Sequence, residues 1–160
     1  MKKLNLGCGE DYKEGWINID VNKNYKADIY SDINIFPYPF KNNEFDEVYA
    51  SMILEHLDNP ILALKELSRI PKQNAIIKII VPHATSYSNL GDLQHKFSFT
   101  ESTFEKNLLI EYGINNLVLI NKKFLFENNK WKKLIPFKKY LKIFFNGIYD
   151  DILFKFKVIK

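Results

Sequence analysis

The residues that point most directly to chemistry lie in the first 20 positions. The segment LNLGCGEDYKEGWINID, residues 4–20, starts with an apolar run, turns through Gly7 and Gly9, and ends at Asp20. Glycine lets a chain turn tightly after a strand and lets a ligand approach the backbone. A carboxylate at the end of the next strand can accept charge-assisted hydrogen bonds from both hydroxyls of a ribose, worth about 1.5–3 kcal/mol each. This spacing predicts a site for a nucleoside-containing ligand.

The residues around the glycines distinguish between two kinds of nucleotide. A dinucleotide-binding turn has a third glycine three positions after the second one, but Tyr12 occupies that position. Glu10, Asp11 and Glu14 flank the turn and would repel a diphosphate. They favour a positively charged ligand without phosphate, such as S-adenosylmethionine, and a nicotinamide oxidoreductase is the weaker alternative. Asp32, which follows the next strand-like run, could accept a hydrogen bond from the adenine amino group.

The three histidines, His56, His83 and His95, all follow the fourth and fifth expected strands. Ligands of open α/β sheets bind beyond the carboxyl ends of the strands. If the ligand is S-adenosylmethionine, transfer of its methyl group to a hydroxyl, an amine or a protonated imidazole needs a base, and histidine has an ordinary pKa of about 6.5. We rank His83 and His95 as the candidate bases on the substrate side. His56 is the third catalytic candidate, although we expect it chiefly to line the pocket near the methionine part of the ligand. A structural role is the alternative for each of the three histidines.

The same loops could also supply metal ligands. His83, Asp92 and His95 could form a three-ligand site. Metal-assisted methylation more usually relies on acidic ligand pairs, so we expect no metal. Glu55 and Tyr87 are further polar residues of the same predicted pocket. The segment 87–104 is expected to fold over the substrate, with a packed connector as the alternative.

An alternation of strands and helices must position these residues. Short β-like runs cover 2–6, 16–20, 27–33, 45–51, 74–82, 114–126 and 152–160. A helix through Ile70 should begin with Asp58 as its N-cap and Pro60 in its first turn. Another should run from Thr100 or Ser102 to residue 112, and an amphipathic one over 135–145. The pattern is typical of an α/β fold with a mainly parallel sheet.

Five segments together resemble one family. LNLGCG, GWINID, the loop DINIFPYPF, FDEVYASMILEHL and IIVPH look like a class I S-adenosylmethionine-dependent methyltransferase. More narrowly, they resemble a small bacterial and archaeal subfamily in which a short turn joins the first two strands. The resemblance covers about residues 3–112 well. It implies a Rossmann-like sheet of seven mostly parallel strands in the order 3-2-1-4-5-7-6, with the last strand antiparallel.

The length of 160 residues predicts one domain over residues 1–160. We expect a cofactor-binding half (1–82) and a substrate-side half (83–160). The resemblance also assigns a site. Asp20 would hold the ribose, Asp32 would lie near adenine, and Ser51 would approach the methionine part. The implied cofactor-binding residues are Asn5, Leu6, Gly7, Cys8, Gly9, Asp20, Val21, Asp32, Ile33, Ser51 and His56.

Charge is distributed unevenly along the 160 residues. Residues 1–80 carry ten Lys/Arg and twelve Asp/Glu, whereas residues 81–160 carry thirteen and seven. Eight lysines with a single acid, Glu127, lie between Lys122 and Lys142, interleaved with Phe124, Phe126, Trp131, Phe137 and Tyr140. Such a segment can attract an anionic acceptor, an acidic partner or a membrane surface, and a merely solvated face is the alternative. The lone Cys8 and the lack of a signal sequence or an apolar run of about 20 residues favour a cytoplasmic protein.

We therefore expect methyl transfer to O or N of a small or medium acceptor, for instance an anionic saccharide or a lipid-linked intermediate. The alternatives are methylation of a protein or RNA partner, and a cofactor-binding subunit without catalysis of its own. The motifs Asn/Asp-Pro-Pro-Tyr and Pro-Cys are absent, so nucleic acid is the less favoured partner. A homodimer is one assembly that the chain could form.

Overall fold

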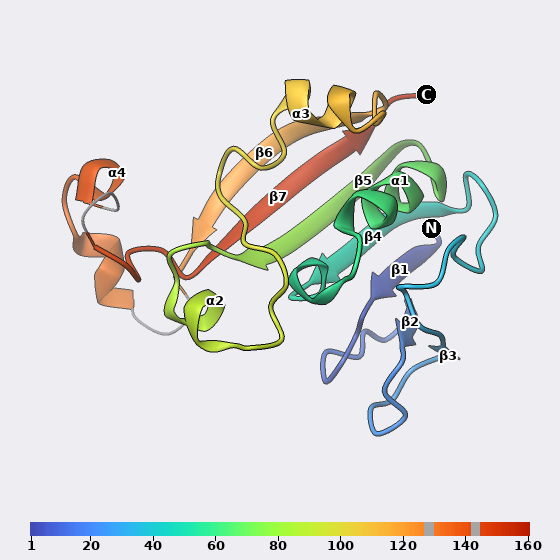
Figure 1. Ribbon diagram of the computed structural model, residues 1–160. Coiled ribbons are helices and arrows are strands. Elements are labelled where there is room, and N and C mark those ends of the chain that lie inside the picture. The colour runs from blue at the N-terminus through green and yellow to red at the C-terminus, as the bar shows by residue number, and fades with distance from the viewer. Residues whose placement is uncertain (127–129, 142–144) are drawn as a thin grey trace.

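The chain folds around one seven-stranded sheet (Figure 1). The computed structural model describes residues 1–126, 130–141 and 145–160, with the backbone alone at positions 130, 131 and 139. The strand order is β3-β2-β1-β4-β5-β7-β6. Strands β1 to β5 pair in parallel, and β7 is antiparallel to β5 and β6. The predicted order and the antiparallel last strand are confirmed. The strands are β1 (Lys3–Leu6), β2 (Ile17–Asp20), β3 (Ile29–Tyr30), β4 (Phe45–Ser51), β5 (Pro71–Pro82), β6 (Leu117–Leu125) and β7 (Asp151–Val158).

Short helices occupy the connections after β4. They are η1 (Leu54–His56), α1 (Pro60–Arg69), α2 (Tyr87–Gly91), α3 (Lys106–Glu111), η2 (Lys130–Leu134) and α4 (Lys138–Leu141). Turns and loops without a helix join β1 to β2, β2 to β3 and β3 to β4. Within the described ranges, no helix is long and apolar enough to cross a bilayer. Strand β7 pairs directly with β5, so residues from both sides of the expected boundary at Pro82 contribute to one sheet.

The start of α1 differs from the prediction by one residue. Asn59, and not Asp58, is the N-cap, because its side-chain oxygen accepts a hydrogen bond from the backbone N–H of Leu62 at 3.0 Å. The carboxylate of Asp58 instead forms an ion pair with Lys96 at 2.5 Å. Two neighbouring residues that are both good caps cannot be ranked from sequence, since the choice depends on a tertiary contact.

The later helices are shorter than predicted. Helix α3 begins at Lys106, because the predicted start at Thr100 is used in a turn, where its N–H donates to the hydroxyl of Thr103 at 2.8 Å. The predicted start at Ser102 lies in that same turn segment. Of the helix predicted over 135–145, α4 covers four residues, and positions 142–144 lie outside the described residues.

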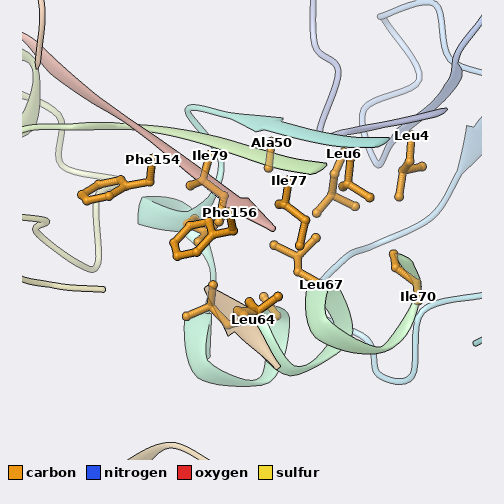
Figure 2. Close-up of a cluster of buried hydrophobic side chains, with 14 of the residues drawn as sticks. Leu4, Leu6, Ala50, Leu64, Leu67, Ile70, Ile77, Ile79, Phe154 and Phe156 are labelled. Carbon is orange, nitrogen blue, oxygen red and sulfur yellow. The ribbon is translucent and has the colours of Figure 1, made fainter. Parts of the chain in front are cut away.

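The hydrophobic core lies on one side of the sheet. Alternate residues of β1, β4, β5 and β7 point toward α1 and α3 and form a single buried cluster with them (Figure 2). Each fully buried aliphatic or aromatic side chain stabilises the fold by about 1.5–3 kcal/mol relative to an exposed one. The cluster therefore fixes where the strands end, and with them the loops that follow. Its members include Leu4, Leu6, Ile77, Ile79, Phe154 and Phe156 from the strands and Leu64, Leu67 and Leu109 from the helices.

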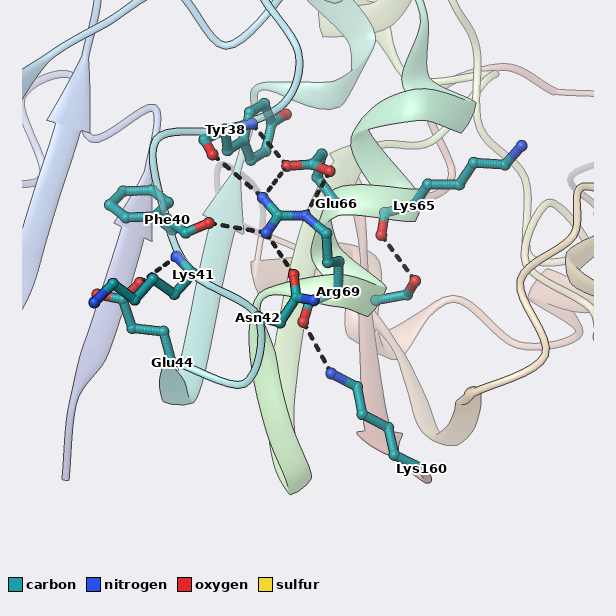
Figure 3. A network of polar contacts seen from close by, with 10 residues as sticks. Tyr38, Phe40, Lys41, Asn42, Glu44, Lys65, Glu66, Arg69 and Lys160 are labelled. Atoms are coloured by element: carbon teal, nitrogen blue, oxygen red, sulfur yellow. Dashed lines mark hydrogen bonds and ion pairs between the residues drawn. The ribbon is translucent and has the colours of Figure 1, made fainter.

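Arg69, the only arginine in the sequence, ties the loop before β4 to α1 (Figure 3). Its guanidinium donates to both carboxylate oxygens of Glu66, at 2.8 and 2.6 Å, and to the carbonyl of Phe40 at 2.8 Å. Glu66 also accepts a hydrogen bond from the N–H of Tyr38 at 2.7 Å. Burial opposes ionisation, but the bonds from Arg69 and Tyr38 hold the pKa of Glu66 below its ordinary value. This network fixes the loop that leads to β4.

We expect Arg69→Ala to lower the free energy of unfolding at pH 7 by about 2–4 kcal/mol, because it leaves the carboxylate of Glu66 largely buried without its charged partner. The loss should shrink as the pH falls through the lowered pKa of Glu66, since the protonated acid needs no counter-charge. Urea unfolding at several pH values measures both effects. Lys65→Ala, an exposed position on the same helix, is the control and should change stability by less than about 0.5 kcal/mol. Equal stability of Arg69→Ala and the parent protein would contradict this account.

Candidate active site

The turn after β1 joins the ends of β1 and β2. The N–H groups of Gly7 and Cys8 both donate to the carbonyl of Ile19, at 2.9 and 3.0 Å. Gly7 and Gly9 have φ values of +65° and +48°, in the region that favours glycine. The sequence analysis expected both glycines to let a ligand approach the backbone, but at Gly7 it is the protein that leaves no room, because a Cβ there would lie 2.5 Å from Cγ1 of Ile53. No protein atom lies within 4 Å of the corresponding position on Gly9, so only that side of the turn is open to a ligand.

Asp20 ends β2 beside this turn. One carboxylate oxygen accepts a hydrogen bond from the N–H of Gly9 at 2.7 Å, and the other accepts one from Asn22 at 2.8 Å. An ionised carboxylate has about four lone-pair sites, so both oxygens can still accept a bond from a ligand. The backbone contacts orient Asp20 as the ribose prediction requires, and the ribose role itself stays a prediction.

Buried asparagines support the short connection between β1 and β2. The side-chain amide of Asn5 donates to the carbonyl of Asp11 at 2.7 Å and to the side chain of Asn18 at 3.0 Å. Asn18 donates its backbone and side-chain N–H groups to Asp28, at 2.7 and 3.0 Å, and these bonds hold the pKa of Asp28 below its ordinary value. The hydroxyl of Tyr12 donates to the other oxygen of Asp28 at 2.9 Å. The side chain of Asn5, which was predicted to line the cofactor, thus supports the loop. The sequence analysis did not identify the part that Asp28 plays in this support.

Two of the three acids beside the turn, Asp11 and Glu14, have lysine counter-charges. Asp11 pairs with Lys13 at 2.6 Å, and Glu14 pairs with Lys26 at 3.1 Å. The ammonium group of Lys26 also lies 3.7 Å from the centre of the Tyr12 ring. The repulsion of a diphosphate that the sequence suggested is therefore weaker than an unpaired set of acids would produce.

The other predicted cofactor residues follow the same edge of the sheet. Leu6 and Ile33 are buried in the core, whereas Val21 is exposed. Ser51 is the last residue of β4 and is half-buried. Asp32 follows β3 and accepts a hydrogen bond from the N–H two residues later at 2.9 Å. Their contacts with a cofactor stay predictions.

Cys8 does not have the properties of a reactive thiol. It is buried, and its sulfur donates to the carbonyl of Lys26 at 3.5 Å. Burial raises the pKa of the Cys8 thiol, and the negative charge of Asp20 acts in the same direction. The thiolate, which is the nucleophilic form, is therefore disfavoured at neutral pH.

The structure brings two of the three histidines together. The rings of His56 and His95 are in contact, with centroids 4.7 Å apart, and Nε2 of His95 lies 3.5 Å from the carboxylate of Asp92. Glu55 completes the cluster: one atom from each of Glu55, His56 and His95 lies within 4.8 Å of the others. Among the described residues, neither carboxylate oxygen of Glu55 nor Nδ1 of His95 has a hydrogen-bond partner, although all three atoms are buried. Burial raises the pKa of Glu55 to about 7, and the charges of Asp151 and Asp92 contribute in the same direction.

Glu55 is a candidate functional residue to which the sequence analysis gave no role. It was placed in the pocket without one, because sequence does not show that its carboxylate is fully buried. Glu55, His56 and His95 could also supply three ligands to a metal ion, a different set from the one considered with His83. The expectation that no metal is bound stays a prediction.

His83 lies in a different environment. Its Nδ1 is 2.9 Å from the hydroxyl of Thr85, and its Nε2 is 3.4 Å from the carboxylate of Glu101. The ring is buried and packs against Tyr149, with centroids 5.5 Å apart. Proton transfer from a substrate to His83 would require one of these contacts to break, so the geometry favours His95 as the base.

A cavity of about 400 Å³ adjoins the cluster. Ile53, which faces Gly7, is part of its wall, so the cavity lies next to the glycine turn. The segment 87–104 contributes both to the wall of this cavity and to the core, and its closure over a substrate stays a prediction. Its Lys96 and Phe97 N–H groups donate to the carbonyl of Glu55, at 2.8 and 3.3 Å, whereas its Phe99 is buried in the core. The cavity is lined by Ile53, His56, Leu93, Gln94 and Lys96.

A family model described as a methyltransferase domain matches residues 4–79. This range contains the glycine turn, Asp20 and Glu55. Residues 4–79 thus match a methyltransferase domain, in agreement with the resemblance to class I S-adenosylmethionine-dependent methyltransferases.

Solved structures share this fold. An S-adenosylmethionine-dependent methyltransferase from Archaeoglobus fulgidus is 23% identical, with a TM-score of 0.71, over 98% of this chain and 85% of that one. One from Mesorhizobium loti is 11% identical, with a TM-score of 0.67, over 98% and 90%. A chain in a complex that contains the Trm112 methyltransferase activator of Haloferax volcanii is 12% identical, with a TM-score of 0.68, over 99% and 83%. No curated protein matches the chain.

The residues at the carboxyl edge fit S-adenosylmethionine as the methyl donor of this methyltransferase. Gly9 leaves space open beside the turn, and Asp20 keeps lone pairs for ribose hydroxyls. The methyltransferase match over residues 4–79 favours S-adenosylmethionine over the nicotinamide alternative. The narrower subfamily with a shortened turn stays a prediction.

The basic segment, residues 122–142, is only partly exposed. Lys132 is buried and paired with Asp150 at 2.6 Å, so the interpretation of Lys132 as part of an exposed binding patch is wrong. The ammonium group of Lys138 donates to the carbonyl of Lys133 at 2.6 Å and lies 4.9 Å from the centre of the Phe126 ring. Lys122, Lys123 and Lys133 are exposed. Glu127, Lys142 and the side chains of Lys130, Trp131 and Lys139 lie outside the described residues.

We expect Asp20→Asn to weaken binding of S-adenosylmethionine at least about tenfold, because it removes the charge from the acceptor of the ribose hydroxyl bonds. Titration calorimetry measures the dissociation constant. Asp11→Asn, which alters an exposed acid of the same turn, is the matched control and should bind the donor as the parent protein does. Unchanged affinity of Asp20→Asn would remove the ribose assignment.

The two glycines should respond differently to alanine. Gly7→Ala places a Cβ against Ile53 and should lower the melting temperature more than Gly9→Ala, which adds only the strain of a positive φ, about 1–2 kcal/mol. Gly9→Ala should instead weaken donor binding, because its Cβ occupies the open side of the turn. Thermal unfolding and calorimetry on both variants test this contrast. Equal donor affinity of Gly9→Ala and the parent protein would show that the donor lies elsewhere.

Proposed function

We propose that the protein transfers a methyl group to O or N of a small or medium acceptor, with Glu55 and His95 receiving the acceptor proton. The observation that carries this proposal is the buried cluster, in which both carboxylate oxygens and Nδ1 of His95 have no partner among the described residues. Buried polar atoms are ordinarily hydrogen-bonded. Proton acceptors that lack a hydrogen-bond partner in the protein and lie near a cavity are typical of a site in which the substrate supplies the missing partner.

S-adenosylmethionine supplies a methyl group activated by its sulfonium, so that an acceptor lone pair displaces it and S-adenosylhomocysteine leaves. The protein must align the acceptor, and alignment alone supplies about 7–11 kcal/mol. The hydroxyl or amine proton must also leave, and ionised Glu55 or neutral His95 can receive it. Asp92, 3.5 Å from Nε2 of His95, stabilises the imidazolium that forms when Nδ1 takes the proton.

The narrower acceptor class that we propose is anionic, for instance a saccharide or a lipid-linked intermediate. Lys96 lines the cavity beside His56 and can attract a negative group. Its ion pair with Asp58 must rearrange for that contact. Transfer to such an acceptor should decline with rising salt, and a neutral acceptor would show no such decline.

Methyl transfer should depend on the ionisation of Glu55. Turnover by the parent protein should rise with pH through about 7, the raised pKa of Glu55, because only the ionised carboxylate can take the proton. Glu55→Gln should lower turnover at least about 100-fold and lose this dependence. The readout is transfer of tritium from methyl-labelled S-adenosylmethionine into the small-molecule fraction of a cell extract.

Two controls accompany this test. Glu111→Gln, at an exposed position of α3, should transfer methyl groups as the parent protein does. Treatment with a chelator should leave turnover unchanged, whereas a loss would favour metal binding by the same three side chains. Full turnover by Glu55→Gln with the parent pH profile would overturn the proton-transfer role.

The second candidate function is a cofactor-binding subunit that acts with a partner protein. The observation that favours it is the likeness to a chain in a complex with a methyltransferase activator. Size fractionation of the extract distinguishes the two functions. Transfer with small molecules alone supports a self-sufficient enzyme, and transfer that requires the protein fraction supports a partner or a macromolecular acceptor.

A further inference from the structure

The sheet has a second face that the described helices leave open. The buried apolar residues of α1, among them Leu64 and Leu67 (Figure 2), belong to the cluster on the first face. Leu109, the buried residue of α3, belongs to the same cluster. Along β5, Ile77 and Ile79 point into that cluster and are fully buried, whereas Ile76, Lys78 and Ile80 alternate with them and are only half-buried. Side chains of a strand alternate between the two faces. Ile76, Lys78 and Ile80 therefore lie on the opposite, open face.

An open face is unusual for this kind of sheet. Strands β1 to β5 are parallel, and parallel sheets occur almost only with both faces covered, usually by helices. Here the connections before β4 contain no helix among the described residues. Trp16 covers part of the face at one edge, in contact with the ring of Tyr49 at 6.5 Å between centroids. Over β5 and β7, Ile76, Lys78, Ile80, Leu153 and Lys155 remain only half-buried, and Lys157 is exposed.

The register of the strands arranges this face into apolar and basic rows. Glu47, Ile76 and Lys157 are neighbours in one row, and Ile80 and Leu153 are opposite each other four residues further along β5. Between these rows, Lys78 lies directly opposite Lys155. Like charges directly opposite each other on one face are destabilising.

The face has a clear excess of positive charge. Glu47 pairs with both Lys3 and Lys78, at 3.0 and 2.7 Å. Lys155 and Lys157 have no ion-pair partner in the part of the chain that the structure describes. An excess of lysine next to apolar rows favours a partner with acidic and apolar groups.

We propose that this face binds an acidic amphipathic helix of a partner protein. A helix is about 10–12 Å wide, and strands are about 4.8 Å apart, so one helix covers the width of β4, β5 and β7. Its apolar stripe would pack on Ile76, Ile80 and Leu153, and its flanking carboxylates would neutralise Lys155 and Lys157. A second copy of the chain would bring lysines against lysines. The proposal is independent of the methyl acceptor, since the face is opposite the core and its binding is measured without turnover.

The test uses two synthetic peptides of about 20 residues, roughly 30 Å long as helices. Both carry a leucine stripe, flanked by glutamate in one and by lysine in the other. Fluorescence anisotropy at about 0.1 M salt should show that the acidic peptide binds at least tenfold more tightly than the basic one, and more weakly as salt rises.

The variant Lys155→Glu/Lys157→Glu separates binding from folding. Residue 155 faces Lys78, so the reversed charge replaces a repulsion by an ion pair, and the melting temperature should stay equal or rise. The acidic peptide should bind this variant at least tenfold more weakly. Lys65→Glu/Lys106→Glu, at exposed positions of α1 and α3, changes the net charge equally and should keep the parent affinity.

Three outcomes would overturn the proposal. The first is equal affinity of the acidic peptide for both double variants, or no preference for it over the basic peptide. The second is tighter binding of polyuridylate that the Lys155→Glu/Lys157→Glu variant abolishes, which would assign the face to RNA. The third is a parent protein that sediments as a dimer and that this variant dissociates, which would assign it to a second copy.

Discussion

The structure depends on parallel pairing of β1 with both β2 and β4. Parallel strands end at a common edge, and this pairing brings Gly7, Asp20 and Ser51 from distant parts of the sequence to that edge. The one-sided core of β1, β4, β5 and β7 against α1 and α3 stabilises the pairing. The candidate active site is formed by strand ends and loops at this edge, so its geometry follows from the packing of the strands.

The first half of the fold compensates for missing helices with polar contacts. Asn5, Asn18 and Asp28 form a chain of hydrogen bonds that holds the connection after β1, and Arg69 holds the loop before β4. Such networks stabilise loops without adding a second layer of apolar packing. Because these connections contain no helix, one face of the sheet stays open. The proposed docking face is therefore a consequence of the short connections.

The local features of the cofactor edge could be predicted from sequence. The positions of Gly7, Gly9 and Asp20 after apolar runs have direct physical meanings, and the strand order follows from a resemblance that several motifs carry together. Features that depend on side-chain environment could not be predicted. Lys132 belongs to a lysine-rich segment, but burial beside Asp150 makes it structural. Gly7 is required by Ile53, which is distant in sequence and close only in the fold.

The histidines show the same limit. Their place after two neighbouring strands predicted one shared pocket, and the structure unites His56 with His95 but gives both nitrogens of His83 protein contacts. Glu55 became a candidate only when its burial was known, since burial gives an ordinary carboxylate a pKa of about 7. A sequence shows which ionisable side chains are present. Their burial in the fold sets their pKa values and thus decides which of them can transfer protons near neutral pH.

The central claim is that the donor binds where β1 and β2 end. A crystal structure with S-adenosylhomocysteine tests it most directly. The account predicts ribose hydroxyls within hydrogen-bond distance of Asp20 and the nucleoside on the open side of Gly9. A nucleoside bound at another edge, with Asp20 in contact only with Gly9 and Asn22, would contradict it.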